Sequence, residues 1–300
     1  MNTPNPLYTF TIQFVGPIDI PLSFELFRHW GDDGIDRWDG TRFIRTTSLA
    51  GQVMPYVCRV TGSIDEPALE VTVIQATHVP TVTALVSRMF VTAPSALADL
   101  MRVDPRIAQL ELRFRGVRPV IQSDLFTALV RSITAQQVNL LWATTLRRRL
   151  AETFGQRHQI GAHWVFRLEP NALAAANVPD LRALQFSTRK AEYVIGLAHA
   201  VTEGLLDLEA LRLAPDDEVI ERITALRGLG RWTAEWFLAR ALGRARVSAG
   251  DLGVRKAVAK VYLQGRMPSE IEVRERTAHW GEASGVAQQL LLQSLRVEDA

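Results

Sequence analysis

Cysteine and lysine are scarce in this chain, and each scarcity excludes a kind of chemistry. The 300 residues include one cysteine, Cys58, which excludes an intrachain disulfide, a cysteine-ligated zinc site and a four-cysteine iron–sulfur cluster. Only Lys190, Lys256 and Lys260 are lysines, so arginine carries nearly all of the positive charge. Few side chains are therefore available for a mechanism that needs a primary amine.

Long apolar runs are also missing. No stretch approaches the roughly 18 uninterrupted apolar residues of a membrane span, and the N-terminal segment MNTPNPLYTF lacks the basic and apolar parts of an export signal. We therefore expect a soluble, intracellular protein of the cytoplasm with no membrane partner. A hydrophobic content of 47% is sufficient for one large globular domain or two.

Charge is unevenly distributed along the chain. Residues 1–115 contain 10 Lys and Arg against 12 Asp and Glu, whereas residues 116–300 contain 24 against 20. The second part is thus mildly basic, which permits a polyanionic partner without establishing one. A run of three arginines, Arg147 to Arg149, is typical of an exposed, solvated helix face.

The pattern of hydrophobic residues predicts an α+β fold. Segments rich in β-branched and aromatic residues predict an antiparallel sheet with strands at 8–16, 41–49, 53–62 and 68–76. Helical spacing predicts two flanking helices, at 22–30 and 81–90. Residues 1–115 are therefore expected to form an N-terminal β-sheet domain.

From Ser123 onward the apolar residues recur with the period of an α-helix. The expected helices lie at 124–134, 140–154, 171–176, 188–202, 216–226, 231–242, 252–263 and 283–296. Residues 116–300 are therefore expected to form an all-α domain.

The segment from Leu226 to Lys256 has the most specific pattern in the chain. It begins LRGLGRWTA, in which Gly228 and Gly230 permit a tight turn directly before a helix. The unpaired N–H groups and the positive dipole end of that helix are suited to a phosphate. An ordinary helix–turn–helix corner uses glycine in the same way, so the turn alone leaves both interpretations open.

A lone carboxylate follows this turn. Asp251 lies 21 positions after Gly230, between two glycine-containing segments, and an apolar helix follows it. An acid in this place can cap the helix. Near a sugar, it can also stabilise positive charge and help to activate water.

The two segments together resemble a known superfamily. LRGLGRWTA resembles the L-P-G-hydrophobic-G-x-x-T-A hairpin of the helix-hairpin-helix DNA glycosylases, with Arg227 in place of proline, and SAGDLGVRKAV resembles their catalytic-aspartate segment. Within that superfamily, the chain resembles the AlkA-type 3-methyladenine DNA glycosylases. The resemblance implies that the sheet domain is similar to TATA-binding protein and that residues 116–300 form the helix-hairpin-helix glycosylase domain.

The resemblance implies a DNA N-glycosylase of the DNA-3-methyladenine glycosylase II type, a hydrolase of base excision repair. It would flip alkylated or deaminated purines out of duplex DNA and excise them, with Asp251 as the catalytic residue. Bifunctional members place a lysine where this chain has Trp232, so the resemblance implies a monofunctional enzyme that leaves an abasic site. The alternative is a non-catalytic DNA-binding protein that recognises damaged or bent duplex.

The remaining site residues follow from the same resemblance. Trp232 and Trp236, four positions apart on one helix face, are expected in the base pocket, with Phe24 on the opposite wall. One of two glutamines is expected to fill the gap left by the flipped base. The expected DNA-binding residues are Gly228, Leu229, Gly230, Arg231, Thr233, Gln136 and Gln137.

No cofactor is required by this chemistry, and no iron–sulfur cluster is expected. In the family, hairpin carbonyls bind a sodium or potassium ion, and the matching carbonyls belong to Thr224, Leu226 and Leu229. The expected partner is double-stranded DNA with a damaged base, bound by a monomer associated with the nucleoid. Ala283 and Ser284 stand where the family has an aromatic residue and an arginine, which leaves the preferred lesion open.

Overall fold

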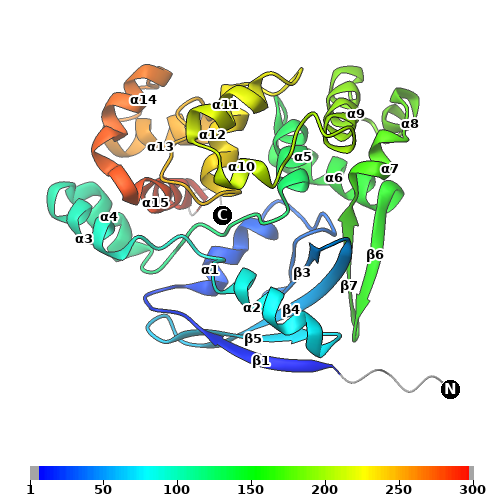
Figure 1. Ribbon diagram of the computed structural model, residues 1–300. Helices are drawn as coiled ribbons and strands as arrows, with labels where there is room; N and C mark the ends of the chain where they lie inside the picture. The colour runs from blue at the N-terminus through cyan, green and yellow to red at the C-terminus, as the bar shows by residue number, and fades with distance from the viewer. Residues whose placement is uncertain (1–6, 297–300) are drawn as a thin grey trace.

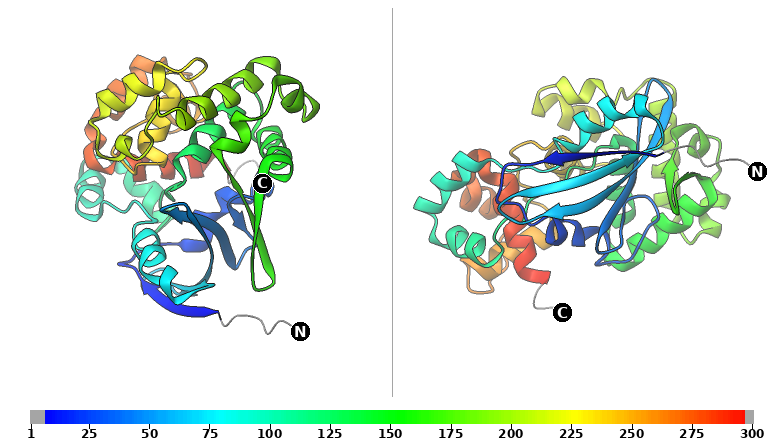
Figure 2. Two further views of the ribbon diagram at one scale, coloured as in Figure 1. Left: turned by 45° about the vertical axis from the view of Figure 1, so that its right-hand side comes forward. Right: turned by 90° about the horizontal axis from the view of Figure 1, so that it is seen from below.

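The computed structural model describes residues 7–296 of the chain (Figure 1). A five-stranded sheet lies beneath a large group of helices, and the two parts are in contact (Figure 2). Among the described residues, no helix is long and apolar enough to cross a membrane.

The sheet is antiparallel throughout and has the strand order β1-β5-β4-β3-β2. Its strands are β1 (Tyr8–Gln13), β2 (Arg37–Trp38), β3 (Arg42–Leu49), β4 (Gln52–Gly62) and β5 (Pro67–Val73). The four predicted strands are thus confirmed. The sequence does not predict β2, because two residues are too short to show a period.

Two short helices cover this sheet. They are α1 (Ile20–Phe24), which continues as a 3-10 turn over Glu25–Phe27, and α2 (Val79–Val86). Asp19 caps α1, since its Oδ1 accepts a hydrogen bond from the Leu22 N–H at 2.9 Å. Both α1 and α2 begin and end at earlier residues than the sequence predicts.

The helical part contains every long helix that the sequence predicts after residue 123. The described helices are α3 (Pro94–Val103), α4 (Pro105–Arg113), α5 (Leu125–Ala135), α6 (Leu140–Phe154), α7 (Pro170–Ala174), α8 (Val178–Ala183), α9 (Thr188–Thr202), α10 (Ala210–Leu213), α11 (Asp216–Thr224), α12 (Arg231–Arg240), α13 (Leu252–Tyr262), α14 (Glu270–Thr277) and α15 (Ser284–Arg296).

The expectation that this part is helical throughout is wrong in one place. Strands β6 (Gly155–Ile160) and β7 (His163–Leu168) form an antiparallel hairpin between α6 and α7. Gly161 makes its turn with a φ of +55°, a conformation that favours glycine. Ile160 and Val165 are buried against Ile44 and Val57 of the five-stranded sheet, a contact between distant segments that local periodicity does not predict.

Two apolar cores hold the helices together, and the candidate site lies where they meet. The first helical core combines side chains of α5, α6, α9, α11 and α12. The second helical core combines α3, α4, α13 and α15. Helix α12 thus belongs to one core and α13 to the other, so the loop between them brings two separately packed helices together.

A buried ion cluster joins the sheet part to the helical part. Arg131 Nη1 lies 2.7 Å from Asp33 Oδ2, and Arg147 Nε lies 3.0 Å from the same oxygen. Arg131 also pairs with Asp36, which binds Arg45 of β3. The prediction of an exposed arginine run is therefore wrong for Arg147, because its carboxylate partner lies 114 positions away in the sequence.

Candidate active site

The turn between α11 and α12 requires glycine at its centre. Gly228 has a φ of +89°, and a Cβ at this position would lie 2.3 Å from ring carbons of Tyr193 on α9. The backbone of the turn therefore lies directly against an aromatic ring. Arg227, which replaces the usual proline, is exposed, and its Nη2 lies 3.0 Å from Glu192.

Gly230 has a different role from Gly228. It is the N-cap of α12, no side chain caps the helix, and no atom lies within 4 Å of an ideal Cβ on this glycine. The first N–H groups of α12 thus lie beside open space, a geometry that suits an approaching phosphate. Arg231 is exposed at the same helix end, with its Nε 3.0 Å from Glu235 Oε1.

Two of the other predicted hairpin contacts point inward. The side chain of Leu229 is buried in the first helical core. Thr233 is 0% exposed, so its hydroxyl does not reach the surface where a phosphate would bind. Leu229 can therefore offer only backbone groups to DNA, and the predicted contribution of the Thr233 hydroxyl is not supported by its position.

The two glutamines after α5 have separate positions. Gln136 Nε2 donates a hydrogen bond to the Gly228 carbonyl at 2.8 Å, which ties the end of α5 to the hairpin. Gln137 is exposed and has a φ of +54°. Gln136 is therefore engaged within the protein, whereas the side chain of Gln137 lies at the surface.

Asp251 has both of its carboxylate oxygens engaged. Oδ1 accepts a hydrogen bond from the Val254 N–H at 2.9 Å and so caps α13. Oδ2 accepts a hydrogen bond from Trp232 Nε1 at 3.0 Å. The structure thus brings together two of the predicted residues, which lie 19 positions apart, and holds the half-buried carboxylate in one orientation.

The loop before Asp251 is fixed by a residue that the sequence does not single out. Gln288 on α15 accepts a hydrogen bond from the Ser248 N–H at 2.8 Å, and the Ser248 carbonyl accepts one from the Asp251 N–H at 2.9 Å. Gln288 lies 40 positions from Ser248, so no local pattern predicts this contact.

The predicted pocket aromatics are only partly brought together. Trp232 and Trp236 are both half-buried on α12, and Trp236 packs against the first helical core. Phe24 is 0% exposed inside the sheet domain, where its ring stacks on Phe43 with centroids 4.4 Å apart. The placement of Phe24 on an open pocket wall is therefore not supported, since the apolar core of the sheet encloses its ring.

Ala283 and Ser284, the two residues that depart from the family pattern near the C-terminus, are buried as well. Ala283 is fully buried beside Trp280 in the second helical core, and Ser284 Oγ donates a hydrogen bond to the Gly281 carbonyl at 2.5 Å. The small residues at these two positions therefore fit a closed core.

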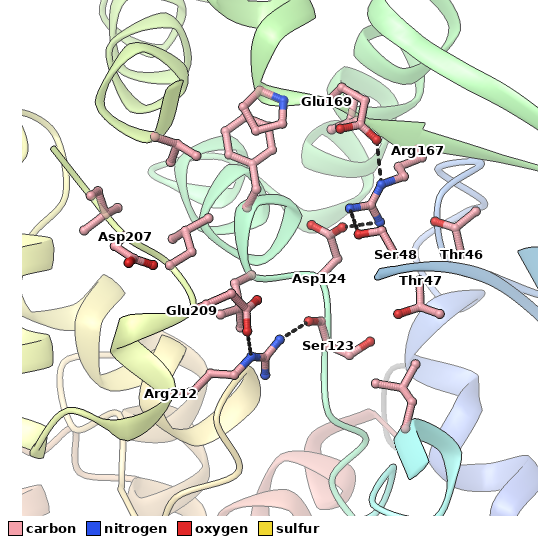
Figure 3. Close-up of a pocket in the computed structure, with 18 of the residues that line it drawn as sticks. Thr46, Thr47, Ser48, Ser123, Asp124, Arg167, Glu169, Asp207, Glu209 and Arg212 are labelled. Carbon is pink, nitrogen blue, oxygen red and sulfur yellow. Dashed lines mark hydrogen bonds and ion pairs between the residues drawn. The ribbon is translucent and has the colours of Figure 1, made fainter. Parts of the chain in front are cut away.

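A cavity of about 500 Å³ lies between the sheet and the helices, away from all of these residues (Figure 3). Arg167 lies 2.7 Å from Asp124 and 2.6 Å from Glu169, and Arg212 lies 2.6 Å from Glu209. Asp207 also lines the cavity, so four carboxylates face two guanidinium groups there, and none of the predicted site residues lines it.

Comparison with known proteins decides the family. The family model described as HhH-GPD superfamily base excision DNA repair protein matches residues 130–283, which include Gln136, the hairpin, Trp232 and Asp251. The chain belongs to the HhH-GPD superfamily. Within the described residues no group of three or more His, Cys, Asp or Glu side chains is placed to bind a metal ion.

Several proteins that are similar to this HhH-GPD protein are named DNA-3-methyladenine glycosylase. It is 29% identical over 188 residues to the DNA-3-methyladenine glycosylase of Bacillus subtilis, covering 61% of each chain. It is 33% identical over 153 residues to DNA-3-methyladenine glycosylase 2 of Escherichia coli, covering 49% of this chain and 52% of the relative. The chain thus matches less than two thirds of the length of these relatives.

Structural similarity to a solved protein extends over nearly the whole chain. The 3-methyladenine DNA glycosylase of Archaeoglobus fulgidus superimposes with a TM-score of 0.84 and covers 94% of this chain and 97% of its own, at 24% identity. The predicted α+β architecture with a helix-hairpin-helix glycosylase part is therefore confirmed.

Proposed function

We propose that this protein is a monofunctional DNA glycosylase that flips alkylated or deaminated purines out of duplex DNA and hydrolyses their N-glycosidic bond. The hydrogen bond between Trp232 Nε1 and Asp251 Oδ2 carries the proposal, because it joins an aromatic surface suited to a base with a carboxylate suited to a sugar. Both lie at helix starts that follow the hairpin.

The chemistry follows from this arrangement. As the bond between C1′ and the purine nitrogen breaks, its electron pair leaves with the base and positive charge develops on the sugar. The ionised Asp251 carboxylate stabilises that charge and accepts a hydrogen bond from the water that attacks C1′. The water's proton passes to solvent, and the product is an abasic site.

DNA binding would use the surface at the start of α12. The N–H groups after Gly230 would hold a backbone phosphate, assisted by the exposed guanidinium of Arg231. Gln137 would enter the duplex to fill the gap, while Gln136 would set the distance between that loop and the hairpin through its bond to Gly228. All of these groups belong to one copy of the chain, so we propose that it binds duplex DNA as a monomer.

We propose that the carbonyls of Thr224, Leu226 and Leu229 hold a monovalent cation. The Leu226 carbonyl accepts one hydrogen bond, from the Leu229 N–H at 3.1 Å, and retains a lone pair. Within residues 7–296, no hydrogen bond to the Thr224 or Leu229 carbonyl is formed outside the helices. Sodium or potassium bound here would supply positive charge near the phosphate, and no further cofactor is proposed.

The positions of the lysines support hydrolysis over strand cleavage. Lys190 Nζ donates a hydrogen bond to the Thr134 carbonyl at 2.8 Å, and burial lowers the pKa of this amine to about 8. Lys260 Nζ donates to the Ser294 carbonyl at 2.9 Å, and Lys256 is exposed on α13. The amine that a lyase needs is replaced by the indole of Trp232.

A release assay tests the proposal. Duplexes that contain 3-methyladenine, 7-methylguanine, hypoxanthine or uracil are incubated with the full chain, and free base and abasic sites are measured. We expect release of at least one purine and no borohydride-trapped protein–DNA adduct. Binding without release from any duplex would instead support the non-catalytic alternative, and a trapped adduct would contradict the monofunctional mechanism.

A further inference from the structure

The cavity between the sheet and the helices has a net negative charge (Figure 3). Its volume of about 500 Å³ is in the range of small-molecule pockets. Its walls come from β3, the start of α5, the end of β7, the end of α9 and the segment around α10. Four carboxylates against two guanidinium groups leave a formal charge of −2 on these walls.

On one side of the cavity, the charges belong to Arg167 and its two carboxylate partners. Arg167 lies 2.7 Å from Asp124 Oδ2 and 2.6 Å from Glu169 Oε1. Asp124 Oδ1 also accepts a hydrogen bond from the Thr127 N–H at 2.8 Å, so both of its oxygens are engaged. Within residues 7–296, Glu169 Oε2 accepts no hydrogen bond. One guanidinium thus balances two carboxylates, and this side retains one negative charge.

On the other side, the charges belong to the segment around α10. Arg212 Nε lies 2.6 Å from Glu209 Oε2. Asp207 Oδ1 accepts a hydrogen bond from the Ala210 N–H at 3.0 Å, and in the described part of the chain no cationic side chain pairs with this carboxylate. Figure 3 shows Asp207 and Glu209 across the cavity from Arg167. A second negative charge therefore remains, separated from the first.

A buried hydroxyl without a partner also lines the cavity. Thr46 on β3 is 4% exposed, and among the described residues its hydroxyl forms no hydrogen bond. In Figure 3 this hydroxyl is directed toward Ser48 and Asp124. Burial of a hydroxyl is costly unless a hydrogen bond compensates for the loss of water. A ligand with an N–H group in the cavity would supply that bond.

The rest of the lining favours an extended organic cation over a metal ion. Leu85, Val201 and Leu208 line the cavity and are only half-buried, so they leave apolar surface for an aliphatic chain. Within residues 7–296, no group of three or more His, Cys, Asp or Glu side chains is placed to bind a metal ion. Two separated negative charges with apolar surface between them match a molecule with an ammonium group at each end and methylene groups in the middle.

We propose that this cavity binds a linear polyamine. One ammonium group lies between Thr46 and Glu169, the other binds Asp207 and Glu209, and the methylene chain packs on the apolar side chains. The site joins the sheet to the helical part, because Thr46 belongs to β3 and the carboxylates to later segments. It uses none of the residues assigned to base release, so it is a binding activity beyond the proposed glycosylase.

Isothermal titration calorimetry with the full chain tests the site. The probe is spermidine, a linear triamine, at constant ionic strength. Butylamine carries one positive charge on a similar chain, and Mg²⁺ carries two charges without a chain. We expect saturable binding of one spermidine per chain, at least about tenfold tighter than binding of either comparison cation.

Variants of the lining locate the bound probe. The double variant Glu169→Gln, Asp207→Asn removes one negative charge from each side, and we expect spermidine affinity to fall about tenfold. Thr46→Val keeps the shape of the side chain but removes the hydroxyl, and we expect a loss of about threefold. The matched control is the double variant Glu275→Gln, Glu282→Gln, which removes two charges at exposed positions outside the cavity and should keep the wild-type affinity.

Absence of spermidine binding, or equal affinity for spermidine and Mg²⁺, would overturn the inference. Wild-type affinity in both cavity variants, with folding verified by circular dichroism, would overturn it as well. If the double cavity variant does not fold, the isosteric Thr46→Val decides alone. The titration contains no DNA, so its result is independent of whether the protein releases a base.

Discussion

Trp232 holds Asp251 in its orientation, in addition to the proposed role of its indole as a surface for a base. Its Nε1 is 3.0 Å from Oδ2, on the carboxylate oxygen that does not cap α13. The cap fixes one oxygen by local geometry, whereas the indole fixes the other from a different helix. The candidate catalytic carboxylate therefore depends on how α12 and α13 are placed relative to each other.

Trp232→Phe separates these two contributions. The phenyl ring retains an aromatic surface, but Asp251 loses a hydrogen bond that holds it in position, so we expect single-turnover base release to fall about tenfold. Rapid-quench measurement of release from a damaged duplex checks this value. Trp164→Phe on β7, in a different part of the fold, is the matched control and should behave as the wild type. An unchanged rate for Trp232→Phe would show that the bond has no role in positioning.

Residue types and spacing point to Asp251, Trp232 and the two glycines as candidate site residues, because these lie within one continuous segment. They also point to Gln136, but not to its hydrogen bond with Gly228, because the two residues are 92 positions apart. Phe24 and Thr233 were expected at a ligand surface and are enclosed in cores, since their side-chain directions depend on packing between distant elements.

At the scale of elements, the hairpin between α11 and α12 uses its two glycines for different purposes. Gly228 makes room for Tyr193, so its role is internal packing. Gly230 faces open space at the start of α12, so its role is outward. A sequence shows only that both are glycine, and the distinction needs the position of α9.

Alanine substitutions distinguish the two roles. Gly228→Ala should lower the free energy of unfolding by roughly 1–3 kcal/mol, because the new methyl group collides with Tyr193 in a strained backbone conformation. Gly230→Ala should leave stability within about 1 kcal/mol of the wild type but weaken DNA binding about tenfold, since the methyl group would enter the phosphate site.

Urea denaturation and fluorescence anisotropy with a duplex containing an abasic site measure the two quantities. Equal losses of stability in the two variants, or full DNA affinity in Gly230→Ala, would disagree with this division of roles.

At the scale of the whole molecule, the ion cluster around Asp33 links the sheet to the helices. Burial raises the pKa of Asp33, but the charges of Arg131 and Arg147 outweigh this effect and lower the pKa from 3.8 to about 2. A carboxylate with a depressed pKa in the folded state stabilises the fold above its unfolded pKa, and this contribution is lost as the pH falls from about 4 toward 2.

Asp33→Asn tests this link. It leaves two buried guanidinium groups without their shared carboxylate, so we expect a loss of about 3–5 kcal/mol in the free energy of unfolding at pH 7. The difference from the wild type should shrink between pH 4 and pH 2, because the wild-type carboxyl also becomes neutral there. Urea denaturation across this pH range measures both, and a difference that does not depend on pH would contradict the electrostatic explanation.

The sheet strands and most of the long helices of the fold could be predicted from periodicity, because each is a local pattern. The contacts that join distant parts could not. The burial of Arg147 against Asp33 and the hydrogen bond between Gln136 and Gly228 both combine residues from separate segments.

Asp251→Asn is the most direct test of the account as a whole. Asparagine can still cap α13 through its side-chain oxygen, so the fold and DNA binding should be retained, while the negative charge beside the sugar is lost. We predict that single-turnover release of the preferred purine falls at least about 100-fold, with affinity for an abasic-site duplex within about threefold of the wild type. Release at the wild-type rate by the folded variant would contradict the assignment of Asp251 as the catalytic residue.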